Sequence, residues 1–503
     1  MIRSAGILMP ITSLPSPYGV GTLGKEAREF IDFLVDAGQS YWQILPVGPT
    51  GYGNSPYAAV SSFAGNPYLI DLDELVEEHY LDEEDLIPLQ NIKDPTHVDY
   101  GMLYRVKMPI LMKAADRMPR VMPTDYFTFL KDNAYWLKSY AVFMAIKEQQ
   151  EGRSWQEWPD PLRRKDKEAI LALIPSLHEK ISRYERIQYF FFKQMTAIKK
   201  YANDRGIRII GDLPFYVALD SVDVWAAPEQ FCLDEDRKPV VCAGMPGQKW
   251  GNPLYDWDRM KADDYAWWIA RAWAQYRYCD VLRLDHFQGF LKYYAVKMEG
   301  DGQGAWCQGP GLAPLRKLRE RYGECEMIAE DLGELSPELI AMVKASGCPG
   351  MKILQYAFDE NDPGSCYMPF RYEANAVVYT GTHDNDTMIG WIKHEPVRAK
   401  RAAVYLDHPL QDIDLAIMKC GYASVCDLAM VQAQDLLRVD SKSRTNDPAG
   451  DPDNWCWRAK KGAFTPMMAH ALAEDMKLYC RYNWTADAKK SELRAKGALK
   501  SAQ

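Results

Sequence analysis

The sequence predicts an α/β protein built on a (β/α)8 TIM barrel, with large helical and loop insertions at the C-terminal face of the barrel. Short apolar segments alternate with amphipathic helical segments along the chain, which is typical of parallel strands joined by helices. Several apolar segments end in acidic side chains, and the functional groups of such barrels lie at the carboxyl ends of the strands. The chain has 503 residues, against about 250 for an ordinary barrel, which leaves room for insertions.

The strand prediction rests on continuous apolar runs that end in polar or turn residues. Such runs suit strands that are buried on both faces, as the strands of a parallel sheet are. We expect eight strands, at residues 5–11, 41–47, 207–212, 281–285, 327–331, 351–358, 376–380 and 426–431.

The predicted helices between these strands are recognised by apolar stripes and by end signals. Segment 24–38 carries its apolar residues on one face and ends in glycine, as a surface helix of a barrel would. Segment 336–346 opens with Ser-Pro, a pair that suits an N-cap followed by a first-turn proline. Segments 183–205 and 266–279 are rich in aromatic residues and are also expected to be helical.

The spacing of the strands predicts how the chain is organised. We expect a single catalytic barrel over residues 1–503, interrupted by a mainly helical insertion subdomain at 48–206 between the second and third strands. Residues 215–263 are rich in Pro, Gly and Trp and are expected to form a loop insertion over the barrel mouth after the third strand. The helical segments expected within the first insertion are 102–117, 132–151 and 164–177.

Composition excludes several classes of function. The net charge is −9, so neither nucleic acid nor an anionic membrane surface is an expected partner. No segment approaches 18 uninterrupted apolar residues, so we expect no membrane-spanning helix. The 11 cysteines are scattered without a CxxC pair, which favours reduced thiols and a cytoplasmic location. Aromatic residues make up 12% of the chain. Two explanations stay open for this content: packing in the core, and flat surfaces on which sugar rings stack.

Two motifs suggest other chemistry and are rejected. Residues 19–24 read GVGTLG, but two prolines separate them from the preceding strand, and Glu26 stands where a P-loop requires Ser or Thr. The run 383–386, His-Asp-Asn-Asp, could be taken for a metal cluster, but it has no paired histidine partner. We therefore expect no metal ion and no organic cofactor.

The ends of four predicted strands bring carboxyl groups to one mouth. They carry Asp212, Asp285, Glu330 and Asp384. Glycoside chemistry needs such a group, because one carboxylate attacks the anomeric carbon while a second carboxyl protonates the leaving oxygen. Crowded negative charges also raise the pKa of one member, as a general acid requires near neutral pH.

Strand alternation predicts how the nucleophile would be held. Arg283 and Asp285 lie two residues apart in one strand and therefore point to the same face. Arg283 would then orient the Asp285 carboxylate by a charge-assisted hydrogen bond. An ordinary ion pair beneath a loop is the alternative for this pair taken alone.

Several sequence blocks together carry a resemblance to a known family. They are VLRLDHFQGF, MIAEDLGEL, GMKILQYAF, VVYTGTHDNDT, SPYAAVSSFAGNPYLIDLDEL, GDLPFYVALDSVDVW and KWGNPLYDW. The chain resembles the amylomaltases, which are 4-α-glucanotransferases of the glycoside hydrolase family 77 type and are also called disproportionating enzymes. The matched blocks span nearly the whole chain, between Gly6 and Trp457.

The resemblance implies a role for each predicted site residue. Asp285 matches the nucleophile, Glu330 the general acid/base, and Asp384 the acid that holds sugar hydroxyls and stabilises the transition state. Arg283 and His383 match neighbours that position the nucleophile and the bound sugar.

Three further residues match the sugar-binding surface of the family. Asp212 and Trp250 match residues that line the substrate groove, and Tyr57 matches an aromatic residue of the glucan-binding region. Taken alone, Tyr57 and Trp250 fit core or loop packing as well as sugar contact. The chain departs from the family pattern at Gln288, where members often have Arg, and at residues 446–450, which read NDPAG.

Other polar and aromatic residues near these motifs are not assigned a catalytic or sugar-binding role. Asp331 should point away from Glu330, because adjacent strand residues face opposite sides, and is expected to be structural. Asp386 is expected to cap a turn, and Trp273 to pack a helix against the barrel. The role of His286 stays open.

The resemblance implies a 4-α-glucanotransferase with a retaining double-displacement mechanism. Its expected partners are malto-oligosaccharides and starch- or glycogen-type α-1,4-glucans, with glucose as an acceptor. One alternative is an α-1,4-glucan hydrolase using the same carboxylates, in which water intercepts the intermediate. The other is a non-catalytic glucan-binding protein, which the presence of all three carboxylates disfavours.

Overall fold

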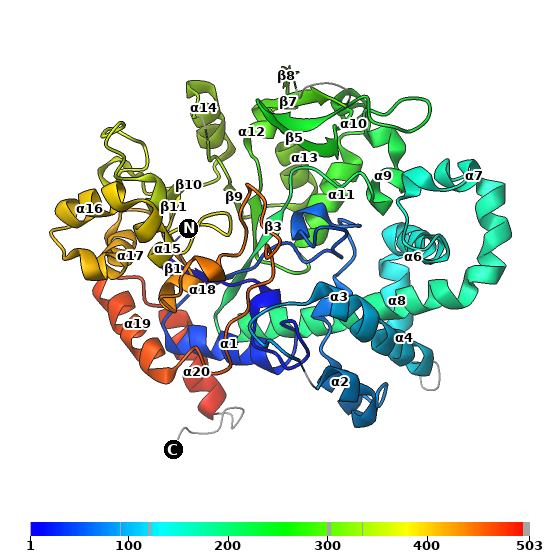
Figure 1. Ribbon diagram of the computed structural model, residues 1–503, viewed down its shortest axis with the longest axis horizontal. Helices are drawn as coiled ribbons and strands as arrows, with labels where there is room; N and C mark the ends of the chain where they lie inside the picture. Colours follow the sequence, from blue (N-terminus) through cyan, green and yellow to red (C-terminus); the bar gives the residue numbers. More distant parts are fainter. Residues whose placement is uncertain (1, 91, 119–121, 299–302, 334, 496–503) are drawn as a thin grey trace.

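The computed structural model describes residues 2–90, 92–118, 122–298, 303–333 and 335–495. Its centre is an eight-stranded parallel sheet with the strand order β10-β11-β12-β1-β2-β3-β6-β9. The terminal strands β9 and β10 approach each other, and the Ala329 N–H donates to the Pro349 carbonyl at 2.9 Å, so the sheet nearly closes into a barrel (Figure 1). The strands are β1 Ser4–Leu8, β2 Tyr41–Gln43, β3 Arg208–Leu213, β6 Val281–Leu284, β9 Met327–Ala329, β10 Gly350–Ile353, β11 Ala376–Tyr379 and β12 Leu428–Gln432.

The predicted barrel is confirmed, with each of the eight predicted strands present. Nearly every residue of these strands is buried, because both faces of the sheet are covered. The first two strands end earlier than the apolar runs suggested. Pro10 and Pro46 lie in those runs, and proline cannot donate a hydrogen bond to a neighbouring strand.

Helices surround the barrel in the order expected of alternating strands and helices (Figure 1). The segment expected at 336–346 is α14, and its N-cap Ser336 accepts a hydrogen bond from the Leu339 N–H at 3.2 Å. The helices outside the two insertions are α1 Lys25–Asp36, α11 Ala266–Gln275, α12 Gln288–Leu291, α13 Ala313–Tyr322, α14 Pro337–Ser346, α15 Met388–His394, α16 Pro396–Tyr405, α17 Ile413–Ala423, α18 Ala433–Leu436, α19 Pro466–Leu478 and α20 Trp484–Ala495.

Helices also fill much of the segment between β2 and β3. The two helical segments expected at 164–177 and 183–205 are one continuous helix, α8. Ion pairs from Lys180 to Glu148 at 2.8 Å and from Arg183 to Asp116 at 2.7 Å tie its middle to neighbouring helices. The helices here are α2 Leu72–Glu77, α3 Tyr100–Met102, α4 Met108–Arg117, α5 Thr124–Asp132, α6 Ala134–Gln149, α7 Asp160–Arg163 and α8 Lys167–Asp204, of which α2, α5 and α7 were not expected.

The segment 215–263, expected to be a loop, contains regular structure, and that part of the prediction is wrong. It forms the helices α9 Val222–Ala226 and α10 Trp257–Ala262 and the strands β4 Val241–Met245 and β5 Gln248–Pro253. The strands join β7 Lys292–Lys297 and β8 Gly304–Gln308 in an antiparallel sheet of order β5-β4-β7-β8. Local patterns missed this sheet because β4 pairs with β7, which lies beyond the fourth barrel strand.

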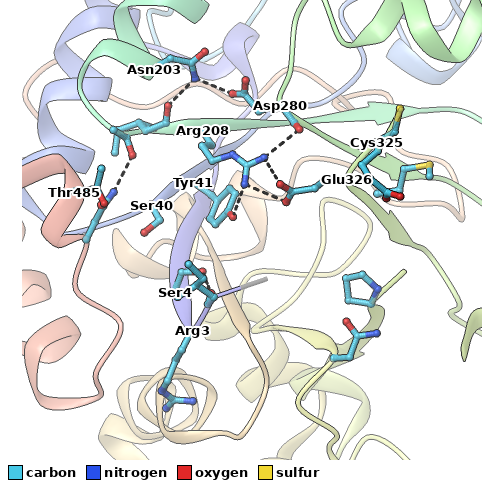
Figure 2. A pocket seen from close by; sticks show the side chains of 18 of the residues that line it. Arg3, Ser4, Ser40, Tyr41, Asn203, Arg208, Asp280, Cys325, Glu326 and Thr485 are labelled. Atoms are coloured by element: carbon cyan, nitrogen blue, oxygen red, sulfur yellow. Dashed lines mark hydrogen bonds and ion pairs between the residues drawn. The ribbon is translucent and has the colours of Figure 1, made fainter. Parts of the chain in front are cut away.

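The N-terminal end of the barrel carries a pocket of about 1000 Å³, seen in Figure 2. Its charged groups bond to one another: Arg208 donates to both oxygens of Glu326 at 2.8 and 3.1 Å and to the Tyr41 hydroxyl at 3.2 Å. This end of a barrel serves stability rather than chemistry, and the mutual pairing agrees with that role. Among the described residues, no helix combines the length and apolar character needed to span a bilayer.

Candidate active site

The carboxyl ends of the barrel strands surround a cavity of about 590 Å³. Five of the eight predicted site residues line it: Trp250, Arg283, Asp285, Glu330 and Asp384. The other three, Tyr57, Asp212 and His383, lie behind this lining and contact it through hydrogen bonds and ring stacking. The barrel thus gathers residues that are distant in sequence into one site.

Arg283 links two of the carboxylates. Its Nη1 donates to Asp212 Oδ2 at 2.8 Å and to Asp285 Oδ1 at 3.1 Å. The side chains of Arg283 and Asp212 are almost fully buried, whereas Asp285 is 27% exposed. Arg283 and Asp285 share a face of the chain, as strand alternation predicted. The charge-assisted bonds fix the Asp285 carboxylate while leaving it accessible from the cavity.

Glu330 follows β9 and is held by backbone groups. Its Oε2 accepts from the His286 N–H at 2.6 Å and its Oε1 accepts from the Leu332 N–H at 2.8 Å. Burial raises the pKa of Glu330 to about 8; the negative charge of Asp285 adds to this rise, and Arg283 opposes it. Glu330 therefore keeps its proton at neutral pH and can donate it to a leaving oxygen.

Asp384 stands on the loop that follows β11. Its side chain is 41% exposed, and its Oδ1 accepts a hydrogen bond from Asn446 Nδ2 at 2.7 Å. The guanidinium of Arg444 donates to the Asp384 backbone carbonyl. Asp384 is thus anchored from a distant loop and presents its carboxylate to the cavity.

Asp435 holds both ends of this loop. The buried carboxylate accepts from the Thr380 hydroxyl at 2.5 Å and from the Met388 N–H at 2.7 Å. Asp435 lies on α18, directly after the last barrel strand. A single buried side chain therefore fixes the span that carries His383 and Asp384.

Tyr57 braces the carboxylates from behind. Its hydroxyl donates to Asp212 Oδ2 at 2.7 Å. Its ring stacks on His383, with centroids 5.0 Å apart and an interplanar angle of 14°, and lies 5.8 Å from the ring of Trp455. Burial raises the pKa of the Asp212 carboxyl, and Arg283 opposes this rise. Tyr57 and Asp212 line a small neighbouring cavity of about 30 Å³ rather than the large one.

We expect Tyr57→Phe to lower the free energy of unfolding by about 1–2 kcal/mol, because a buried carboxylate loses one hydrogen bond. Urea denaturation measures the change. Tyr367→Phe is the matched control, since the buried Tyr367 hydroxyl has no hydrogen-bond partner within the described part of the chain. Equal stability losses in both variants would contradict a bracing role for the Tyr57 hydroxyl.

Trp250 overhangs the cavity from β5. Its side chain is 40% exposed. Its ring stands edge-on to His286, with centroids 5.1 Å apart and planes at 82°, and lies 6.3 Å from Tyr216. An exposed indole held in this way offers an apolar face to a ligand in the cavity.

The structure shows where Asp331, Asp386 and His286 lie relative to the cavity. Asp331 turns away from the cavity and accepts from the Met351 N–H at 2.7 Å. Asp386 accepts from the Thr387 N–H at 2.7 Å and from the Ser441 hydroxyl at 2.8 Å, as a turn cap does. His286 lines the cavity with φ of +46°, and burial lowers the pKa of its imidazole.

Sequence reasoning missed the supports that come from the last loop. Asn446, Arg444 and Trp455 follow β12 and reach the site only through the tertiary fold. Their one signal in the sequence is the departure at residues 446–450, a segment that includes Asn446. Within the part of the chain that the structure describes, no three His, Cys, Asp or Glu side chains form a metal-binding group.

A barrel mouth with an arginine-paired carboxylate and an acid of raised pKa is typical of enzymes that act on glycosidic bonds. The family model for 4-alpha-glucanotransferase, glycoside hydrolase family 77, matches residues 9–464. The chain belongs to this family and is an enzyme with 4-alpha-glucanotransferase activity.

Individual relatives agree with the family model. The 4-alpha-glucanotransferase of Streptococcus pneumoniae serotype 4 is 41% identical over 495 residues, covering 96% of this chain and 98% of that protein. That of Thermus thermophilus is 42% identical over 488 residues, covering 92% and 96%. The solved amylomaltase from Streptococcus agalactiae in complex with acarbose is 38% identical, has a TM-score of 0.92, and is matched over 96% of this chain and 100% of that one. The family and fold predicted from the sequence are confirmed.

Proposed function

We propose that the enzyme works by a retaining double displacement on the residues of the cavity at the carboxyl ends of the barrel strands. The Asp285 carboxylate attacks the anomeric carbon of a donor glucan and forms a covalent glucosyl-enzyme, while Glu330 gives its proton to the departing 4-oxygen. Glu330 then takes the proton from the 4-hydroxyl of an acceptor, and that oxygen displaces Asp285. The product has a new α-1,4 bond, and Glu330 regains its proton.

The observation that carries this proposal is the contrast between two neighbouring carboxyl groups. Asp285 is bonded to the Arg283 guanidinium, whereas burial raises the pKa of Glu330 to about 8. Two carboxyl groups with different environments divide into a nucleophile and an acid. Asp384, anchored by Asn446, would hold sugar hydroxyls and stabilise positive charge in the transition state.

We infer that the donors are malto-oligosaccharides and starch- or glycogen-type α-1,4-glucans, and that glucose can serve as an acceptor. The open cavity and the exposed Trp250 support a chain-like sugar substrate. We also propose a cytoplasmic location, because all eleven cysteines are free thiols, as is usual in a reducing compartment.

Incubation with maltotriose tests transfer against hydrolysis. Transfer should give glucose and longer chains, with the number of reducing ends unchanged, because each bond broken is replaced by a bond formed. Chromatography of the products and a reducing-end assay measure the two quantities. A steady rise in reducing ends without longer products would favour the hydrolase alternative.

We expect Trp250→Ala to raise the share of hydrolysis in the products severalfold. The variant opens the cavity beside the covalent intermediate, and water exclusion is what favours a sugar acceptor. The ratio of glucose released to reducing ends formed from maltotriose measures this share. Trp306→Ala is the matched control, since Trp306 is similarly exposed, at 39% against 40%, but lies on β8 at the far edge of the same sheet. An unchanged ratio in Trp250→Ala would contradict this role.

A further inference from the structure

A second large groove lies outside the catalytic cavity. It has a volume of about 920 Å³ and runs between α5, α6 and α8 of the insertion and α11 and α13 of the barrel. None of its lining residues lines the catalytic cavity. The groove therefore needs an explanation separate from the chemistry at the strand ends.

Aromatic rings form two sides of this groove. On one side Trp273 and Tyr322 stack face to face, with centroids 4.1 Å apart and planes at 1°. On the other side stands Tyr135. Trp273 remains 38% exposed and Tyr135 60% exposed, so packing within the chain accounts for only part of their surface. Flat aromatic surfaces that solvent can reach suit the apolar faces of sugar rings.

The rest of the lining is small or polar. Ala270 and Ala274 lie one turn apart on α11 and leave room between the walls, and polar residues such as Asp132 and Lys193 stand among the aromatic ones. Acidic and basic side chains both occur, so the groove has no dominant sign of charge to select an ionic ligand. A neutral polyhydroxyl chain can use the aromatic surfaces together with both donors and acceptors.

We propose that this groove is a second glucan-binding site, which holds a segment of an α-1,4-glucan away from the catalytic cavity. The identity of the ligand rests on the proposed donor class. A polymer held here would have its other segments at raised effective concentration near the barrel mouth. A trisaccharide in the catalytic cavity gains nothing from the groove.

Affinity electrophoresis in native gels containing soluble starch tests this site, with acarbose added to saturate the catalytic cavity. The wild-type protein should still be retarded by starch, and Trp273→Ala should raise the apparent dissociation constant for starch about fivefold or more, through lost stacking. Trp484→Ala is the matched control and should remain retarded like the wild type. Trp484 is 66% exposed and its ring lies 4.6 Å from Tyr482, far from the groove on α20.

A second variant guards against a folding defect. If Trp273→Ala lowers the melting temperature, Tyr135→Ala is used to test the site instead, because it removes a mostly exposed ring. This variant should also be retarded less by starch than the wild type. Wild-type migration unaffected by starch in the presence of acarbose would overturn the proposal, as would wild-type retardation in both variants. Turnover of maltotriose by the wild-type protein tests the catalytic proposal separately, so the two failures can be told apart.

Discussion

Replacing Asp285 with asparagine should reduce the turnover of maltotriose by about 10⁴-fold or more, the scale on which loss of a covalent nucleophile acts. The amide is nearly the same size but is a much weaker nucleophile. The covalent glucosyl-enzyme should therefore not form, while binding of acarbose, measured by calorimetry, should persist. Single-turnover assays with maltotriose measure the loss of turnover directly.

A control at the other end of the same strand separates the effect on chemistry from an effect on folding. Asp280 lies just before the start of β6, at the opposite end of the barrel from Asp285, and its Oδ2 accepts from the Ile209 N–H at 2.8 Å. Asp280→Asn should lower the melting temperature and leave turnover within about threefold of the wild type. The reason is that residues at the N-terminal end of a barrel contribute to stability rather than to catalysis. Full activity in Asp285→Asn would refute the assignment of Asp285 as the nucleophile.

The barrel and its carboxylates could be predicted because each depends on local pattern. A buried strand is a short apolar run, and Asp285 and Glu330 come directly after such runs. Parallel topology then places all strand ends at one mouth. Strand alternation alone was enough to put Arg283 beside Asp285.

The features that sequence reasoning missed depend on contacts between distant segments. Asn446 and Asp435 hold the Asp384 loop through tertiary hydrogen bonds. Only the departure from the family pattern at residues 446–450 points to Asn446, and no local motif marks Asp435. The strands β4 and β5 were read as a loop because their Pro, Gly and Trp content hides a sheet that is completed by β7. The hydrogen bond from the Tyr57 hydroxyl to Asp212 was likewise not foreseen, and contact of Tyr57 with a glucan stays a prediction.

The alkaline side of the pH–rate profile should report on Glu330. Its pKa is raised to about 8, chiefly by burial, so the group is protonated below that pH and loses its proton as the pH rises through it. The first step needs the protonated acid. We therefore expect kcat/KM for maltotriose to hold from about pH 6 to 7 and to fall tenfold per pH unit well above pH 8. A fall centred near pH 5 would contradict the raised pKa.

Glu330→Gln should lower kcat/KM for maltotriose by about 10³-fold, within the range typical of a lost general acid. With α-maltosyl fluoride as donor the first step should survive, because fluoride departs without a proton. The covalent intermediate should then accumulate, since no base activates the acceptor, and one fluoride per active site should appear in a rapid burst.

Asp331→Asn is the matched control, because the Asp331 carboxylate accepts from the Met351 N–H on the opposite face of the chain. This variant should lower stability and keep the alkaline fall of kcat/KM near pH 8. Equal losses on both donors in Glu330→Gln would show that Glu330 acts on binding or folding rather than on the leaving oxygen.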